Sequence, residues 1–114
     1  HTFDVDTIVA VVPVGYADGI RRDFGRRGGA CDFGGVPRPV GGGVTMDQRV
    51  DEFGPGGHPA VVPVERGAEV VLIGTQDGPE GARSVTAQDW ADILGTIPYE
   101  VVCGFGPRIT RRHL

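Results

Sequence analysis

A run of apolar, mostly β-branched residues, TIVAVVPV, lies near the start of the chain at residues 7–14. Because the run is continuous rather than alternating, it predicts a strand buried on both faces that ends near Pro13. Shorter runs of the same kind predict strands at 30–33, 36–40, 60–64, 69–73 and 99–103, a pair of strands within 44–53, and a last short strand at 108–114. Pro37 and Pro39 place the strand at 36–40 on a sheet edge, since proline cannot donate a ladder hydrogen bond.

One segment has the spacing of a helix instead. Thr86 and Asp89 form a start similar to a capping box, with Thr86 as the N-cap. Apolar residues then recur on one helical face, which consists of Ala87, Trp90, Ala91 and Leu94. Gly95 follows at the usual position of a C-terminal glycine. The pattern predicts a helix over residues 86–94 with Trp90 as its core anchor.

Turn-forming residues separate these elements throughout, with 20 Gly and 9 Pro among 114 residues. Many short strands and a single helix predict a mainly β fold: a small antiparallel β-barrel or sandwich with one short α-helix. The length allows one domain, so we expect residues 1–114 to form a single unit.

Composition narrows the chemistry available to the chain. All 11 basic residues are Arg, so no side chain of this sequence can form a Schiff base. The net charge of −4 and the few aromatics near the Arg clusters argue against a nucleic-acid partner. Cys31 and Cys103 form neither a disulfide framework nor a CxxC motif, and no two His have metal-ligand spacing, so we expect free thiols and no metal site. With no signal peptide and no apolar run near the roughly 20 residues that span a bilayer, we expect a cytoplasmic protein without membrane contact.

Four short segments carry polar or aromatic groups in settings unusual for ordinary turns. They are VGYADG at 14–19, MDQ at 46–48, TAQDWAD at 86–92 and GTIPYE at 95–100. Each has a plain structural interpretation by itself, as a turn, a strand start or a helix cap.

Taken together and in this order, the segments resemble one family. VPVGYADG, MDQ, EVVLIG, TAQDWADILGTI-YE and RITR match, nearly end to end, the C-terminal domain of bacterial alanine racemase in its actinobacterial form. The resemblance implies a two-domain, homodimeric isomerase that uses pyridoxal phosphate to interconvert L- and D-alanine. It also implies an N-terminal TIM barrel that carries the cofactor lysine, and a mostly β C-terminal domain that completes the partner subunit's active site.

The resemblance also assigns roles to individual residues. Tyr99 matches the tyrosine whose hydroxyl meets the cofactor phosphate, and Met46 matches the methionine whose backbone N–H binds the substrate carboxylate. Tyr16 matches a tyrosine that lines the substrate entrance. The other matches are corridor residues: Arg22 and Ile97, with Asp18 in the same loop as Tyr16. The two catalytic bases of the family, the lysine and a tyrosine just upstream of a stretch like His1-Thr2-Phe3, lie outside this sequence. We therefore expect pyridoxal phosphate to bind only where a lysine-bearing barrel is present, and the partners to be that barrel, a second copy and a small carboxylate or amino acid.

The sequence departs from the family pattern at several positions. Gly43 stands where the family usually has a corridor Arg, Thr45 stands where it has Cys, and Pro98 replaces an Asn or His. The Gly- and Arg-rich loop at 25–35 is also atypical. These changes are expected to open the entrance and to remove a positive charge.

Two other functions are compatible with the same residues. The chain could be a stand-alone, cofactor-free isomerase or cyclase of secondary metabolism, whose acid–base candidates are Tyr16, Asp18, Asp47, Tyr99 and Glu100. Alternatively, it could be a non-catalytic binding or dimerisation module that uses apolar surface normally turned toward a barrel domain.

Overall fold

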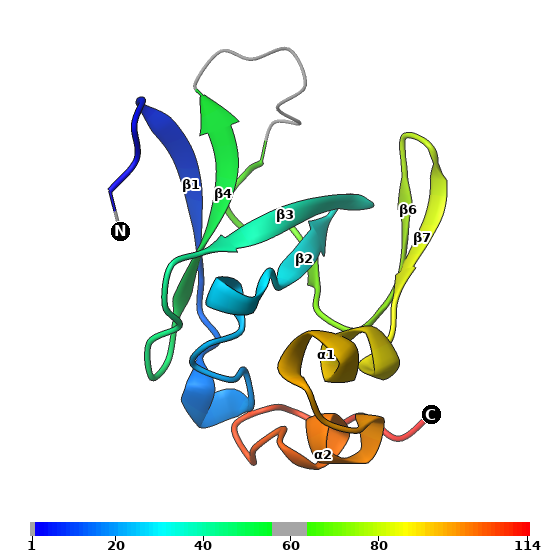
Figure 1. Ribbon diagram of the computed structural model, residues 1–114. Helices are drawn as coiled ribbons and strands as arrows, with labels where there is room; N and C mark the ends of the chain where they lie inside the picture. The colour runs from blue at the N-terminus through cyan, green and yellow to red at the C-terminus, as the bar shows by residue number, and fades with distance from the viewer. Residues whose placement is uncertain (1, 56–63) are drawn as a thin grey trace.

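The computed structural model describes residues 2–55 and 64–114. Its fold is mainly β with two short α-helices (Figure 1). The strands are β1 (Thr7–Val12), β2 (Ala30–Phe33), β3 (Val36–Gly41), β4 (Arg49–Pro55), β5 (Val70–Val71), β6 (Gly74–Gly78) and β7 (Gly81–Val85). The helices are the 3₁₀ turns η1 (Tyr16–Asp18) and η2 (Gly25–Arg27) and the α-helices α1 (Ala87–Leu94) and α2 (Pro98–Cys103).

Five strands form one antiparallel sheet in the order β1-β4-β3-β2-β5. The sheet is strongly curled, so that β3 and β2 cross the direction of β1 and β4 in Figure 1. The predicted class of a small, mainly β, antiparallel barrel-like fold is therefore confirmed. The hairpin of β6 and β7, which the apolar pattern did not predict, stands beside the sheet and contacts it where Gly35 meets Gly78.

The strand at 36–40 forms as predicted, but β3 lies inside the sheet order rather than at its edge. Val40 N–H donates to Gly29 O at 3.0 Å, and successive amides of a strand face opposite sides, so the ring nitrogens of Pro37 and Pro39 face away from β2. On that side β4 pairs with β3 only at Val40 and Gly41. Pro37 and Pro39 thus lie where this side of β3 has no paired strand, so their lack of an N–H leaves no ladder hydrogen bond unmade.

The strand predicted at 7–14 is present as β1, but its predicted burial on both faces is wrong. β1 ends the strand order, and the side chains of Ile8, Val9 and Val11 are 46%, 41% and 62% exposed. Both α-helices lie at the other end of the molecule (Figure 1). An apolar run indicates which residues favour burial, but it does not indicate whether other residues of the same chain pack over them.

The predicted helix is confirmed as α1. Thr86 Oγ1 accepts from the Asp89 N–H at 3.1 Å, and Asp89 accepts from the Thr86 N–H at 2.7 Å, which completes the capping box. Gly95 ends the helix at φ 69°, in the left-handed region that favours glycine.

The strand predicted at 99–103 is wrong, because these residues form helix α2 and raise the number of α-helices from one to two. Pro98 occupies the first turn, where its fixed φ suits a helix and its missing N–H costs nothing. Val101 is buried toward α1 while Tyr99 and Val102 are exposed. The stabilisation from this packing outweighs the preference of Tyr and Val for strands.

Other predicted strands differ as well. Residues 44–48 form a loop, so the segment 44–53 contributes only the start of β4, and residues 108–114 form no strand. The segment 69–73 yields only the two-residue β5. Most of the strand predicted at 60–64 lies outside the described residues.

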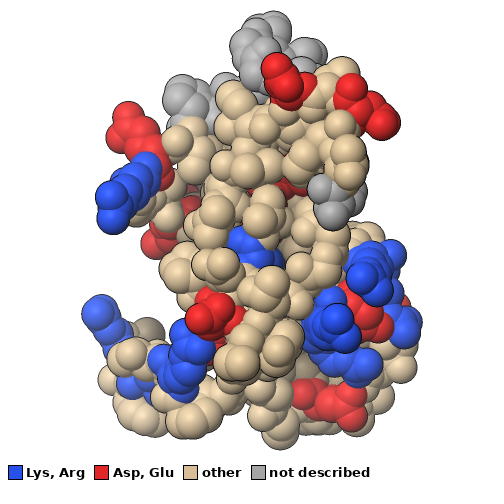
Figure 2. Space-filling model, turned by 90° about the vertical axis from the view of Figure 1, so that its left-hand side faces the viewer, with Lys and Arg blue, Asp and Glu red and all other residues tan. Residues whose placement is uncertain are grey.

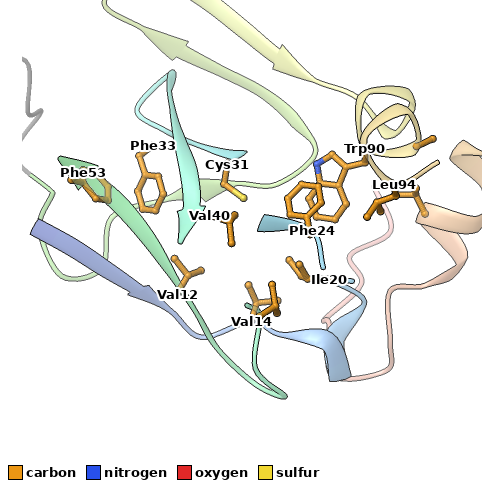
Figure 3. Close-up of a cluster of buried hydrophobic side chains, with 13 residues drawn as sticks. Val12, Val14, Ile20, Phe24, Cys31, Phe33, Val40, Phe53, Trp90 and Leu94 are labelled. Carbon is orange, nitrogen blue, oxygen red and sulfur yellow. The ribbon is translucent and has the colours of Figure 1, made fainter. Parts of the chain in front are cut away.

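The core runs from the sheet to α1 (Figure 3). Phe33 and Phe53 meet edge-to-face on the sheet with ring centroids 4.8 Å apart. Trp90, 1% exposed, packs on Phe24 at 4.3 Å and thereby attaches α1 to the segment before η2. Trp90 is the core anchor that the helical spacing predicted.

Candidate functional site

Three segments singled out from the sequence lie in the lower half of the molecule in Figure 1, two of them on the left and helix α2 further to the right. They are η1, the loop at 42–48 between β3 and β4, and helix α2. The fourth segment, at the start of α1, contributes a helix cap and the core residue Trp90.

The η1 turn and the 42–48 loop are joined through their backbones. Tyr16 N–H donates to Thr45 O and Ala17 N–H donates to Met46 O, both at 2.9 Å. A Cβ on Gly15 would lie 2.3 Å from Thr45 O, so only glycine permits this approach. The glycine of the sequence VGYADG therefore sets the position of Tyr16 relative to Met46.

Both of these side chains are exposed, Tyr16 at 46% and Met46 at 58%. The loop closes on itself, because the N–H and hydroxyl of Thr45 both donate to Gln48 O, at 3.0 and 2.7 Å. Within the part of the chain that the structure describes, the Met46 N–H donates no hydrogen bond. The loop thus carries a fixed backbone donor that is free to bind an acceptor.

Helix α2 carries the other aromatic candidate. Tyr99, in its first turn, is 80% exposed, and Ile97 at the N-cap is 59% exposed. Glu100 is also exposed, but it accepts from Thr96 Oγ1 at 2.8 Å and lies 3.7 Å from Arg21 Nη1. Asp47 in the loop is exposed as well.

Asp18, by contrast, is buried and fully engaged. Its Oδ2 accepts from the Gly15 N–H at 2.9 Å, and its Oδ1 lies 3.1 Å from Arg108 Nε. Asp18 O accepts from Gly106 N–H at 3.1 Å, so this residue connects η1 to the segment after α2. No sequence motif connects Asp18 with Arg108, which lies ninety residues further along the chain.

A second polar cluster, which sequence reasoning missed, lies inside the sheet. Arg49 binds both oxygens of Asp51, at 2.9 and 3.0 Å, and its Nη2 lies 2.9 Å from Cys31 Sγ. All three side chains are fully buried, and Asp32, which follows Cys31 on β2, pairs with Arg83 at 3.1 Å. Burial raises the pKa of Cys31 to about 12 and raises the pKa of Asp51 against the opposing hydrogen bonds from Arg49. Their burial indicates a structural role.

In the view of Figure 2, basic and acidic side chains are intermingled on the right-hand side of the molecule, so they form no continuous basic surface there. Cys31 and Cys103 are both free thiols, the first buried and the second exposed. Among residues 2–55 and 64–114 no three His, Cys, Asp or Glu side chains are grouped so that they could hold a metal ion. No helix in those same ranges is long and apolar enough to cross a membrane.

Comparison with known proteins identifies relatives along the whole chain. The family model for the C-terminal domain of alanine racemase matches residues 1–113. The alanine racemase of Mycobacterium avium is 47% identical over 115 residues, which cover 99% of this chain and 27% of that protein.

Solved structures agree with this match. The alanine racemase of Streptomyces coelicolor A3(2) aligns with a TM-score of 0.70 and 40% identity over 90% of this chain and 24% of its own. The alanine racemase of Bartonella henselae, solved with covalently bound pyridoxal phosphate, aligns with a TM-score of 0.76 and 25% identity over 95% of this chain and 26% of its own.

The matches agree in extent as well as in kind, since the chain spans about a quarter of the length of the curated relatives it matches. The residues that the family model matches include the segments that carry Tyr16, Met46 and Tyr99. The chain belongs to the family of alanine racemase C-terminal domains.

Proposed function

We propose that this chain serves as the C-terminal domain of a pyridoxal-phosphate-dependent isomerase that interconverts L- and D-alanine. In this role it supplies binding groups to an active site whose lysine and tyrosine bases come from a barrel domain. The chain is then not a racemase by itself, because it contains no lysine. The assembly that we propose is a homodimer in which each copy of this domain serves the partner's site.

The free N–H of Met46 is the observation that carries the proposal. A main-chain N–H held by a closed loop gives a short, oriented contact to a substrate carboxylate and needs no rearrangement on binding. The loop is held in place by the two hydrogen bonds to η1, which also bring Tyr16 beside it. Tyr16 then borders the approach to this donor, and Ile97 keeps the corridor role that the family resemblance implies.

The residues present fit one end of the cofactor. Pyridoxal phosphate supplies the electron sink that makes the α-proton of an amino acid acidic. Tyr99 would hold its phosphate, since the exposed phenol makes no hydrogen bond to any described residue and donates without adding charge. The covalent anchor has to come from another domain.

Two further observations favour a domain over a stand-alone enzyme. Asp18, one of the acid–base candidates of that alternative, is committed to Gly15 and Arg108. The exposed apolar side chains of β1 are surface that another domain would cover.

The experiment combines this chain with the remaining, N-terminal part of the Mycobacterium avium alanine racemase, and measures conversion of D- to L-alanine with added pyridoxal phosphate. The native C-terminal domain of that enzyme, supplied in the same way, is the positive control. We expect conversion by the mixture and none by either component alone. A mixture that stays inactive while the control converts alanine would contradict the proposal, and conversion by this chain alone would favour the stand-alone enzyme.

A further inference from the structure

Two arginines beside the 42–48 loop lack carboxylate partners. Arg22 and Arg26 are exposed and make no ion pair in the described part of the chain. Other arginines are neutralised by carboxylates: Arg21, Arg27, Arg49, Arg83 and Arg108. Two arginines without a carboxylate partner thus lie next to the loop that carries the free Met46 N–H.

The position of Arg26 is specific. Its Nη2 lies 3.8 Å from the point that a Cβ on Gly43 would occupy, and apart from Gly43 and its two chain neighbours no other atom of the described residues lies within 4 Å of that point. Gly43 has no positive φ, so its backbone does not lie in the left-handed region that favours glycine. The absence of a side chain at Gly43 leaves space that the Arg26 guanidinium borders.

The backbone on both sides holds this arrangement in place. A Cβ on Gly25 would lie 2.6 Å from Gly42 O and 2.7 Å from Val40 O, so the start of η2 sits directly against the end of β3. Val44 N–H donates to Arg22 O at 3.3 Å on the other side of Gly43. The backbone that carries Arg26 is thus held close to the loop by direct backbone contacts.

We propose that Arg26 is a specificity-determining residue, which holds a positive charge over Gly43 and selects carboxylate-bearing substrates as they approach the Met46 N–H. The inference rests on the proposed function, because it names the substrate class of the same site. A guanidinium is well suited to this task, since it is permanently charged, weakly hydrated and able to bind both oxygens of a carboxylate. The positive charge that Gly43 lacks relative to the family pattern is supplied here by Arg26 of η2.

The first test uses this chain alone and propionate as the probe, because propionate carries the carboxylate of alanine without its amine. Propionate is titrated into ¹⁵N-labelled chain while the shift of the Met46 amide is followed. Arg26→Gln is expected to weaken propionate binding, measured from the Met46 amide shift, about fivefold, which is near the upper range for an exposed ion pair. Arg66→Gln, which removes an exposed arginine from the turn before β5, is the matched control and should leave it unchanged.

The second test restores the charge from the other side. Because the space at Gly43 is open apart from Arg26, the variant Arg26→Gln/Gly43→Arg can place a guanidinium there, and propionate binding should recover. The inference is overturned if Arg26→Gln behaves like Arg66→Gln, if the double variant does not recover, or if Met46 of the unchanged chain does not respond.

A third measurement uses the assembly with the barrel domain. Arg26→Gln should raise KM for alanine about fivefold with kcat unchanged, and added salt should reduce the difference from the unchanged chain. An equal fall in kcat with KM unchanged would overturn the inference. If the unchanged assembly is inactive, the proposed function fails, and the propionate titration still decides whether Arg26 recruits carboxylates.

Discussion

Gly15→Ala tests whether the contact between η1 and the 42–48 loop organises the candidate site. The added Cβ would lie 2.3 Å from Thr45 O and 2.6 Å from Met46 C and O, and these backbone atoms cannot rotate away. The two segments must then separate, which weakens the hydrogen bonds of Tyr16 and Ala17 to the loop. Two weakened hydrogen bonds together with overpacking predict a loss of about 2–5 kcal/mol in the free energy of unfolding.

Urea unfolding followed by the fluorescence of Trp90 measures this loss, because Trp90 is the single tryptophan and is buried in the core. Gly43→Ala is the matched control, since it adds a methyl group to the same loop in open space. It should change stability by less than about 0.5 kcal/mol. The reasoning is refuted if Gly15→Ala and Gly43→Ala unfold at the same urea concentration.

Three further predictions concern the groups around the site. Arg49→Met should cost about 3–5 kcal/mol by leaving Asp51 buried and unpaired, and the added change Asp51→Leu should recover most of this; additive losses in urea unfolding would contradict the pairing. The N–H and hydroxyl of Thr86, at the N-cap of α1, hold the pKa of Asp89 below its usual value. The stability that ionised Asp89 contributes to the fold is therefore complete above the pKa of about 3.9 in the unfolded chain, and it is lost as the pH falls through the lower pKa of the folded chain. Asp89→Asn should remove this acid-side dependence of the urea midpoint, and an unchanged profile would exclude the cap as its source. With the pKa of Cys31 raised to about 12 by burial, a thiol reagent at mildly alkaline pH should label only Cys103 until urea is added, whereas rapid labelling of both would contradict the buried thiol.

The local elements of the fold could be predicted because their signals are short-range. The capping box and Gly95 define α1 by contacts within a few residues. Helix α2 was missed because its β-branched residues favour a strand locally, while Pro98 and the packing of Val101 decide in favour of a helix. The β6–β7 hairpin was missed because its residues, GTQDG and GARSV, carry no alternating apolar pattern.

The candidate site likewise combines features that the sequence predicts with features that it does not. The residues of the candidate site could be proposed from ordered motifs, but their arrangement depends on contacts between distant segments. The fit of Gly15 against Thr45 and the partnership of Asp18 with Arg108 join parts of the chain that no local pattern connects. The position of Arg26 over Gly43 likewise required the structure, although both lie in segments that the sequence marked as unusual.

The central claim is that this domain presents separate groups to cofactor and substrate. In the assembly with a barrel domain, absorbance titration with pyridoxal phosphate gives the cofactor affinity of Tyr99→Phe and Tyr16→Phe. Tyr99→Phe should weaken cofactor binding by about tenfold or more, since a hydrogen bond to a charged group contributes roughly 1.5–3 kcal/mol. Tyr16→Phe should leave the cofactor affinity unchanged and raise KM for alanine. Equal cofactor affinities for the two variants would contradict the account.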